Sequence, residues 1–387
     1  LSLQDMRIGH YDARLGAQGG ITAYVRRVGR AQTRAGHDVL YLGRPLDSDT
    51  ESQALRVRSD QELFSVAAAK ALDVLHLHTP VDHLPDDRVP TLRTMHTNDG
   101  SCPSGSRYLK RSGRPCPRAY SIAGCLWGHF VDHCGSRRPH KTWANFRSIR
   151  REQAQATELL TLTVSRFLKE QMIRSGGPAE HLHVLHSPAP QVPIARAPLP
   201  RQAPPRFVFA GRIEPQKGVD WLLRAVAATG PSIYVDLAGT GHPDDLRALE
   251  QLARDLGIRA QVSFHGWLAE EEVYALIEEA RGVVVPSVWH EPAGLVPLEA
   301  AALGRPVVAS DVGGLPEYAT DAFSLRVPPR DTEALAEALA TLSRHPDQAE
   351  AMGQRGHERA RSTFAMDDFL DRLAAFYEQV RQSPALN

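Results

Sequence analysis

Short apolar runs alternate with amphipathic segments along most of the chain. The clearest run, Gly282 to Pro286, has the length and composition of a strand buried in a parallel sheet. A helix carrying Glu299 is predicted next, followed by a second apolar strand from Pro306 to Ala309. This order predicts a βαβ unit, whose helix begins at the edge where open α/β sheets bind ligands.

The first part of the chain shows the same alternation. A strand at Met6 to Tyr11 leads through a glycine-bearing loop, Gly16 to Gly20, into an amphipathic helix over residues 21–35. Gly19 and Gly20 indicate either a tight turn or a contact with phosphate. Further strands are predicted at residues 39–42, 55–57, 74–77, 89–95 and 159–164.

A proline-rich stretch over residues 186–206 divides the chain, since neither helix nor sheet persists through so many prolines. At 387 residues the chain is longer than one ordinary core, so two domains are expected. We therefore predict an α/β fold of two Rossmann-like, doubly wound domains that face a cleft. The expected parts are a first domain at 1–188 with a Cys-rich insertion at about 97–140, a linker at 189–206, a second domain at 207–364 and a terminal helix within 365–387.

The second domain is expected to open with a strand at Phe207 to Ala210 and a loop from Gly211 to Gly218. Arg212 and Lys217 place two cations on this loop. A guanidinium fork and an ammonium point charge suit a diphosphate, although plain surface loops also carry such charges. Beyond this loop, strands are predicted at 233–238 and 261–265, and helices at 243–256, 269–280, 331–344, 347–361 and 367–380.

Two glutamates, Glu291 and Glu299, flank the start of the helix that follows the clearest strand. Free amides point out of a helix N-terminus and form an anion site. Here they belong to Gly294, Leu295 and Val296. Because carboxylates repel phosphate, we interpret the two glutamates as partners for hydroxyl groups. A phosphate flanked by hydroxyls describes a nucleotide sugar; the alternative is an ordinary βαβ unit with surface acids.

Three histidines are expected at or near strand ends in the first domain, namely His76, His78 and His96. A histidine at such a position is usually structural. His96 differs because it opens an irregular segment, which places it at the carboxyl edge of the sheet, facing the cleft. Asp99 is interpreted either as a cap at the start of that loop or as a carboxylate for a cationic acceptor.

All four cysteines of the chain lie in one short segment, at Cys102, Cys116, Cys125 and Cys134. Disulfides are disfavoured in a chain without a secretion signal, so a structural zinc site is the better interpretation. His129 or His133 is a substitute for one thiolate, and four unrelated thiols are the alternative. The surrounding residues 93–151 are basic, with twelve Arg or Lys, which indicates either a solvated face or a surface for phosphates or an anionic membrane.

Charges balance at formal zero over the chain, which argues against nucleic acid as a partner. No apolar run is long enough to span a membrane, and the first residues lack a signal-peptide profile, so a cytoplasmic protein is expected. The run Asp47-Ser48-Asp49 resembles the metal-binding DxD of another transferase class. It lies in a polar loop without a flanking strand, so a surface loop is favoured there.

These motifs together resemble the retaining glycosyltransferases of family 4, which have the GT-B fold. The matching residues are Gly19-Gly20, the loop 211–218, Gly239, Gly241, and the pair Glu291 and Glu299, which are separated by seven residues. The resemblance implies that Glu291 lies near the transferred sugar and that Glu299 binds the ribose hydroxyls.

The same resemblance implies that Arg212 and Lys217 hold the diphosphate and that His96 meets the sugar. It further implies retention of anomeric configuration with no cofactor for catalysis, the departing phosphate taking the proton of the acceptor. The first domain would hold that acceptor, and the terminal helix, Asp367 to Val380, would cross back onto it.

The segment from Cys102 to Pro139 is similar to the transferases of 2-deoxystreptamine aminoglycoside pathways, of the kanamycin and neomycin types. This similarity implies UDP-glucose or UDP-N-acetylglucosamine as donor and an aminocyclitol as acceptor. Ala293 and the run His186 to Pro190 depart from the family pattern, where a longer side chain and Pro-Asn-Gly are common. Two other functions are a membrane-surface transferase acting on a lipid or polysaccharide, and a nucleotide-sugar epimerase of the same fold.

Overall fold

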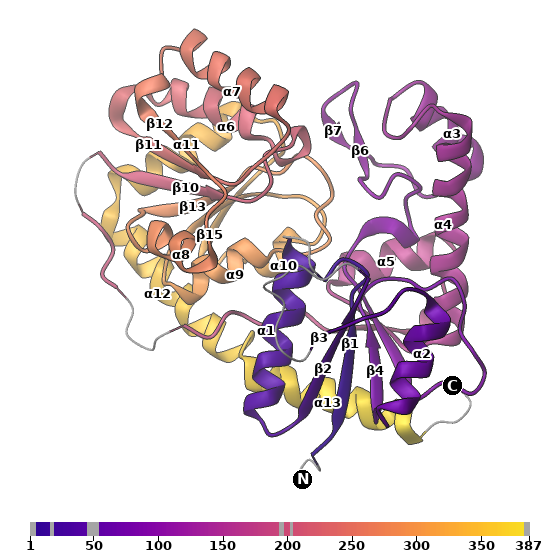
Figure 1. Ribbon diagram of the computed structural model, residues 1–387. Helices are drawn as coiled ribbons and strands as arrows, with labels where there is room; N and C mark the ends of the chain where they lie inside the picture. The colour runs from indigo at the N-terminus through magenta and orange to yellow at the C-terminus, as the bar shows by residue number, and fades with distance from the viewer. Residues whose placement is uncertain (1–4, 16–18, 45–53, 193–196, 202–203, 383–387) are drawn as a thin grey trace.

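The computed structural model describes residues 5–15, 19–44, 54–192, 197–201 and 204–382. Two parallel sheets lie in two separate lobes (Figure 1). Their strand orders are β3-β2-β1-β4-β5-β8-β9 and β12-β11-β10-β13-β14-β15, so each sheet is built outward in both directions from its first strand. The predicted α/β fold of two doubly wound domains is therefore confirmed. The Asp47–Asp49 run lies outside the described residues.

The strands of the first sheet are β1 (Arg7–Tyr11), β2 (Asp38–Gly43), β3 (Ala54–Arg56), β4 (Val74–Leu77), β5 (Thr91–Met95), β8 (Thr161–Thr163) and β9 (Leu182–Val184). Its helices are α1 (Gly20–Arg34), α2 (Asp60–Ala69) and α5 (Arg166–Arg174). The strands of the second sheet are β10 (Arg206–Ala210), β11 (Tyr234–Ala238), β12 (Val262–Gly266), β13 (Gly282–Val285), β14 (Val307–Ser310) and β15 (Ser324–Val327). Its helices are α6 (Val219–Ala228), α7 (Pro243–Asp255), α8 (Glu270–Glu278), α9 (Leu295–Ala302), α10 (Leu315–Tyr318), α11 (Thr332–Arg344) and α12 (Pro346–Ser362).

The central strands consist of small and β-branched apolar residues because both faces of each sheet are covered. Every residue of β13 and β14 is buried, as the apolar runs predict. Helix bounds agree with the predicted ones to within a few residues, which is the usual uncertainty at helix ends. The hydrophobic pattern did not predict α2, β15 or the helix α4 described below.

An insertion between β5 and β8 rises beside the second domain (Figure 1). It contains the turn η1 (Asn98–Gly100), the hairpin β6 (Tyr108–Leu109) with β7 (Arg114–Pro115), and the helices α3 (Ile122–Phe130) and α4 (Pro139–Glu158). The base of α4 is fixed to β5 by a buried ion pair between Glu152 and Arg93. At the far end, Tyr108 joins the core of the second domain, and Arg330 donates to the Gly113 carbonyl at 3.0 Å. The insertion thus touches both domains.

The proline-rich linker is fastened to the second domain. The buried guanidinium of Arg305 donates to the carbonyls of Ala197 and Pro198 at 3.0 and 3.1 Å. Arg281 donates to the Pro200 carbonyl at 3.0 Å. Within its described residues the linker therefore behaves as part of the second domain's surface.

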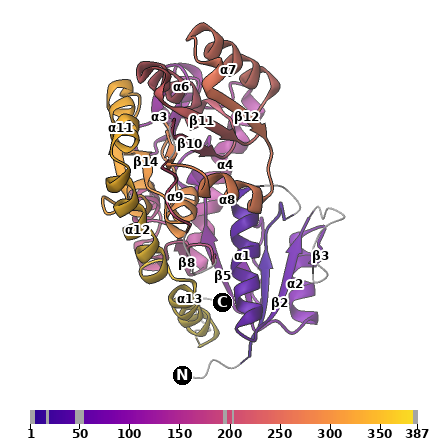
Figure 2. The ribbon, with the colours of Figure 1, turned by 90° about the vertical axis from the view of Figure 1, so that its left-hand side faces the viewer.

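The terminal helix α13 (Met366–Gln382) lies beneath the first sheet, at the opposite end of the molecule from α7 (Figures 1 and 2). Its apolar face, which includes Phe369, Leu373 and Tyr377, belongs to the same core cluster as Ile8 and Val74 of β1 and β4. The chain thus passes between the two domains twice, once in the linker and once between α12 and α13.

Candidate functional site

Two loops meet at the carboxyl edge of the second sheet, beside its first strand. Residues 211–218 follow β10 and residues 286–294 follow β13, and these two strands are neighbours on either side of the point where strand order reverses. Val288 N–H donates to the Gln216 carbonyl at 2.8 Å. Gly218 has φ of 71°, and a Cβ there would collide with the Pro286 carbonyl, so only glycine lets the loops approach this closely.

This approach places Lys217 against Glu291. Lys217 Nζ lies 2.6 Å from Glu291 Oε1, and Ser287 Oγ donates to the same oxygen at 2.6 Å. The ammonium also lies 5.2 Å from the ring centroid of Trp289. Glu291 is 7% exposed, so its carboxylate depends on these two donors. The structure therefore brings together one of the two cations and one of the two glutamates that the sequence indicated, Lys217 and Glu291.

The main chain of Glu291 is held by the turn at Gly313 and Gly314. Gly314 N–H donates to the Glu291 carbonyl at 2.7 Å. Gly313 has φ of 58°, and a Cβ there would collide with the backbone of Glu291. These two glycines therefore fix the position of the glutamate.

Arg212 lies apart from this pair. Its guanidinium donates to Glu214 at 2.7 Å, and its side chain is 63% exposed. Gly211, Gly239 and Gly241 lie behind it and pack backbone against backbone: a Cβ on Gly239 or Gly241 would collide with the carbonyls of Gly211 or Ile213. The described contacts of these glycines are structural.

Two helix N-termini lie next to each other where the two domains meet. Gly19 caps α1 without a side chain, and Gly294 caps α9. A Cβ added at Gly20 would lie 3.4 Å from Leu295 Cδ1, so the two ends are in contact distance. The N-termini of both helices, with free amides that include those of Leu295 and Val296, are therefore adjacent.

Glu299, one turn into α9, is paired with the first domain. Its Oε1 lies 3.0 Å from Arg27 Nη2 on α1. The same Nη2 reaches the Tyr274 hydroxyl at 3.2 Å and Glu270 at 3.3 Å, both on α8. Sequence reasoning missed Arg27, because a charge on the polar side of an amphipathic helix has the same pattern as a solvent-exposed residue.

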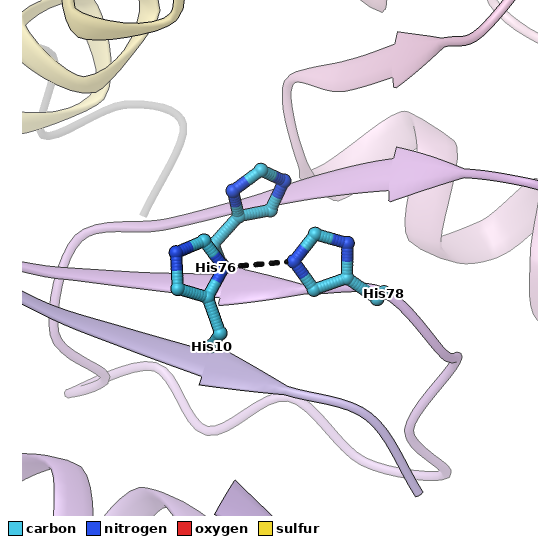
Figure 3. Close-up of side chains that lie close together, drawn as sticks. All are labelled: His10, His76 and His78. Atoms are coloured by element: carbon cyan, nitrogen blue, oxygen red, sulfur yellow. Dashed lines mark hydrogen bonds between the residues drawn. The ribbon is translucent and has the colours of Figure 1, made fainter. Parts of the chain in front are cut away.

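His96 ends a chain of buried hydrogen bonds in the first domain. Its Nε2 lies 3.0 Å from His78 Nδ1, and His78 Nε2 lies 2.9 Å from His10 Nδ1, as Figure 3 shows for the latter pair. His10 Nε2 is 2.7 Å from Gln32 Oε1. Gln32 Nε2 donates to the Tyr377 hydroxyl on α13 at 3.1 Å.

These contacts determine which ring nitrogen of each histidine carries the proton. The Gln32 carbonyl oxygen only accepts, so His10 carries its proton on Nε2 and accepts on Nδ1. His78 then donates from Nε2, and His96 likewise donates from Nε2 to His78 Nδ1. His96 is left with an unprotonated Nδ1 at the carboxyl end of β5.

Burial keeps the histidines of this network neutral. It lowers the pKa of His10 to about 4 and that of His96 to about 3, the latter with a contribution from Arg93. It holds the pKa of His76 and His78 well below the ordinary value, with further lowering by neighbouring histidines. His10, His76 and His78 also place three ring nitrogens within 4.8 Å (Figure 3). Every ring nitrogen of this trio has a hydrogen-bond partner, so we interpret it as a hydrogen-bonded network.

The loop that carries Glu291 also rests on the first domain. Asn98 Nδ2 donates to the His290 carbonyl at 2.8 Å, and Ser165 Oγ donates to the Pro292 carbonyl at 2.6 Å. Asp99 accepts from the Thr97 hydroxyl at 2.6 Å, a local contact between two side chains of this loop. The four cysteines are free and line one small cavity of the insertion.

Solved structures with this architecture exist. The chain superposes on sucrose-phosphate synthase from Thermosynechococcus elongatus with a TM-score of 0.72 at 21% identity, covering 97% of this chain and 98% of that one. It superposes on HepE of Anabaena in complex with UDP and glucose with a TM-score of 0.71 at 17% identity, covering 97% and 100% of the two chains. The fold is GT-B.

Within this GT-B fold, residues 193–359 match the family described as Glycosyl transferases group 1. This match confirms the family-level resemblance for the second domain. D-inositol 3-phosphate glycosyltransferase of Mycolicibacterium paratuberculosis is 39% identical over 175 residues, which cover 44% of this chain and 39% of the relative. The chain thus spans about two fifths of the length of this curated relative. No helix in the described ranges is long and apolar enough to cross a membrane.

Proposed function

We propose that this protein is a retaining glycosyltransferase. It moves a hexose or N-acetylhexosamine from a UDP sugar to a hydroxyl of a small acceptor, without a cofactor for catalysis. The observation that carries this proposal is the pairing of Lys217 with Glu291 at the N-terminus of α9. This pair lies within the segment that matches the group 1 family.

The donor diphosphate would bind where the helix N-termini of α1 and α9 converge. Each nearby cation already has a carboxylate partner, Glu291 for Lys217 and Glu214 for Arg212. An incoming diphosphate offers both cations a second anion. As the sugar departs, negative charge grows on the β-phosphate, and fixed amides and cations of this kind lower the barrier by several kcal/mol.

The two glutamates would serve different parts of the donor. Glu291 is fixed by Lys217, Ser287 and the glycine turn, which suits a carboxylate directed at the transferred sugar. Glu299 lies one turn further along α9, and its free oxygen suits the ribose hydroxyls, while Arg27 holds the other oxygen.

His96 would complete the sugar site from the first domain. Its unprotonated Nδ1 suits a hydroxyl of the sugar as donor, since the hydrogen-bond chain occupies Nε2. Retention follows if the acceptor hydroxyl attacks from the face that the phosphate leaves, with the phosphate accepting the proton of that hydroxyl. In this scheme the cations of the chain itself carry the electrostatic stabilisation.

The acceptor we propose is an aminocyclitol of the 2-deoxystreptamine type. The proposal is supported by the similarity of the segment from Cys102 to Pro139 to transferases of those pathways. Asp99 would pair with an ammonium group of such an acceptor, because it follows His96 at the same sheet edge.

The test is a donor-by-acceptor activity matrix read by mass spectrometry. We expect a mass gain of one hexose or N-acetylhexosamine on an aminocyclitol with a UDP sugar. Donor altered in the absence of acceptor, with no product in any acceptor arm, would instead identify an epimerase. If no combination of donor and acceptor gives turnover but UDP still binds, the protein is a nucleotide-binding protein without transferase activity, and the proposal is overturned.

A second candidate function is transfer to a lipid-linked acceptor at a membrane surface. The observation that favours it is the exposed apolar face of the insertion. Trp127 and Phe130 on α3 are 59% and 50% exposed, and Trp143 on α4 is 65% exposed, within the basic segment 93–151. Apolar side chains beside cations suit an anionic bilayer surface.

Vesicle sedimentation separates the two functions. Under the second function, the protein sediments with anionic vesicles, stays in solution with neutral ones, and loses binding in Trp127→Ser. Trp267→Ser is a matched control, because Trp267 is 55% exposed in the second domain. No sedimentation in any arm would leave the small-acceptor function alone.

A further inference from the structure

The four cysteines of this chain come from four separate pieces of the insertion and line one cavity. Cys102 follows η1, Cys116 follows β7, Cys125 is on α3 and Cys134 lies between α3 and α4. The same cavity is also lined by the buried side chains of Arg107 and His129, among other polar residues. Those two residues decide what the cavity binds.

Arg107 is a buried cation without a carboxylate partner. It is 4% exposed and donates to the carbonyls of Cys116 and Arg118 at 3.4 and 3.0 Å. Among the described residues, no carboxylate pairs with it. A buried guanidinium is costly unless an anion compensates its charge. The neighbouring cysteines supply that anion if they bind a metal as thiolates.

His129 is fully buried with one ring nitrogen free. Its Nδ1 lies 3.0 Å from the Ser136 carbonyl, which only accepts, so the proton sits on Nδ1. Nε2 then holds a bare lone pair, and it has no hydrogen-bond partner in the described part of the chain. A histidine that donates one N–H to a backbone carbonyl and offers its other nitrogen is the usual arrangement of a metal ligand.

We propose that a structural zinc ion binds in this cavity, held by His129 Nε2 and three of the four cysteine thiolates. Three thiolates and a neutral imidazole are a common tetrahedral ligand set for zinc. Zn²⁺ with these ligands carries a single net negative charge, which Arg107 neutralises. His133 is excluded as the fourth ligand because it is exposed.

Metal binding would bring the cysteine sulfurs of this cavity closer together. Zinc–sulfur bonds of about 2.3 Å place tetrahedral sulfurs about 3.8 Å apart. In the described chain, only His10, His76 and His78 form a trio of potential ligand atoms within 4.8 Å of one another. No three of the cysteine sulfurs are therefore that close together, and the sulfurs lie farther apart than in a zinc site. The movement required is a contraction of loops around residues 102, 116 and 134.

This contraction reaches the donor loop. The Cys116 carbonyl accepts from His290 Nε2 at 3.0 Å, and His290 stacks on Phe167 with ring centroids 5.2 Å apart. The residue after His290 is Glu291. A zinc ion would therefore fix the insertion against the loop that carries Glu291, and zinc loss would release it.

The first experiment measures metal in the full chain purified with reductant after growth with zinc. We expect about one zinc per chain by mass spectrometry. Cobalt substitution should give an intense charge-transfer band from thiolate ligands. His129→Gln and three of the four single Cys→Ser variants should lose the ion, whereas His133→Gln, the matched control, should keep it.

A second measurement needs no variant and stays informative if the substitutions prevent folding. A mercurial reagent added to the wild-type protein should release zinc in step with the thiols it modifies. Hydrogen exchange at residues 286–292 should rise after removal of the ion. Far less than one zinc per chain, or cysteines found as disulfides, would overturn the proposal. Zinc retained in every Cys→Ser variant and in His129→Gln would also overturn it.

Discussion

Arg27 Nη2 lies 3.0 Å from Glu299 Oε1 and joins the first helix of one domain to α9 of the other. The Glu299 side chain is only 15% exposed, so without Arg27 its carboxylate would be nearly buried with no counter-charge. We expect Arg27→Met to weaken UDP binding by about tenfold, or about 1.4 kcal/mol, in calorimetric titration. Arg34→Met, an exposed change on the same helix, is the control. Wild-type affinity in Arg27→Met would show that Glu299 needs no partner to bind the nucleotide.

Substitution of the two glutamates of the site should have different effects on nucleotide binding and on turnover. Under the proposed function Glu299 would accept from the ribose hydroxyls, so in Glu299→Gln the Kd for UDP should rise by about tenfold with a smaller change in kcat. Glu291 would be directed at the transferred sugar, so in Glu291→Gln kcat should fall by about 10² with a smaller change in UDP affinity. Steady-state kinetics and UDP titration measure both. Identical losses in the two variants would contradict the division of roles.

Lys217→Met and Arg212→Met should each lower turnover by about 10² or more, because under the proposed function each cation would stabilise the leaving phosphate. Lys217→Met also leaves the 7%-exposed Glu291 without its cation, so it should lose thermal stability as well. Arg224→Met on α6 is an exposed control for the loss of one positive charge. Rates close to wild type in both variants would remove the two cations from the mechanism.

Gln32 should set the tautomer of His96 from a distance. In the wild type, nitrogen-15 NMR should show His96 protonated on Nε2 only. The reason is that Gln32 Oε1 fixes which nitrogen donates in each hydrogen bond from His10 through His78 to His96. Gln32→Met removes that acceptor and should give a mixture of tautomers. We expect kcat to fall by about tenfold with little change in donor KM. The exposed Gln251→Met is the control, and a single unchanged tautomer in Gln32→Met would contradict the ordering.

The buried histidines should make the protein acid-sensitive. In the folded state the pKa of His10 is about 4 and that of His96 about 3, against an unfolded value near 6.5, so the unfolded chain binds more protons below that pH. Stability is therefore complete above about pH 6.5 and falls as the pH approaches the folded values. The slope is about 1.4 kcal/mol per pH unit for each neutral histidine.

Denaturant unfolding between pH 7 and pH 5 measures this slope. His83→Gln removes an exposed histidine and should leave the slope unchanged. A free energy of unfolding that stays constant over this range would mean that the network accepts protons in the folded state.

The sequence allowed the central strands of both sheets to be predicted, because runs such as Val283–Val285 are apolar on both faces. It did not allow α4 to be predicted, since much of this helix is exposed and one of its main anchors is the ion pair of Glu152 with Arg93. Partners distant in sequence leave no local signal. For the same reason Arg27 and Gln32 were missed, whereas Lys217 and Glu291 stood out in glycine-marked loops.

The position of α13 has a consequence for synthesis of the chain. Phe369, Leu373 and Tyr377 close the core of the first domain, yet they are translated after the entire second domain. The first sheet therefore emerges from the ribosome with one apolar face uncovered and with His76 and Gln32 lacking their Tyr377 partner. The second domain, whose core needs none of these residues, can complete its fold first, so the domain that begins the sequence is the last to finish.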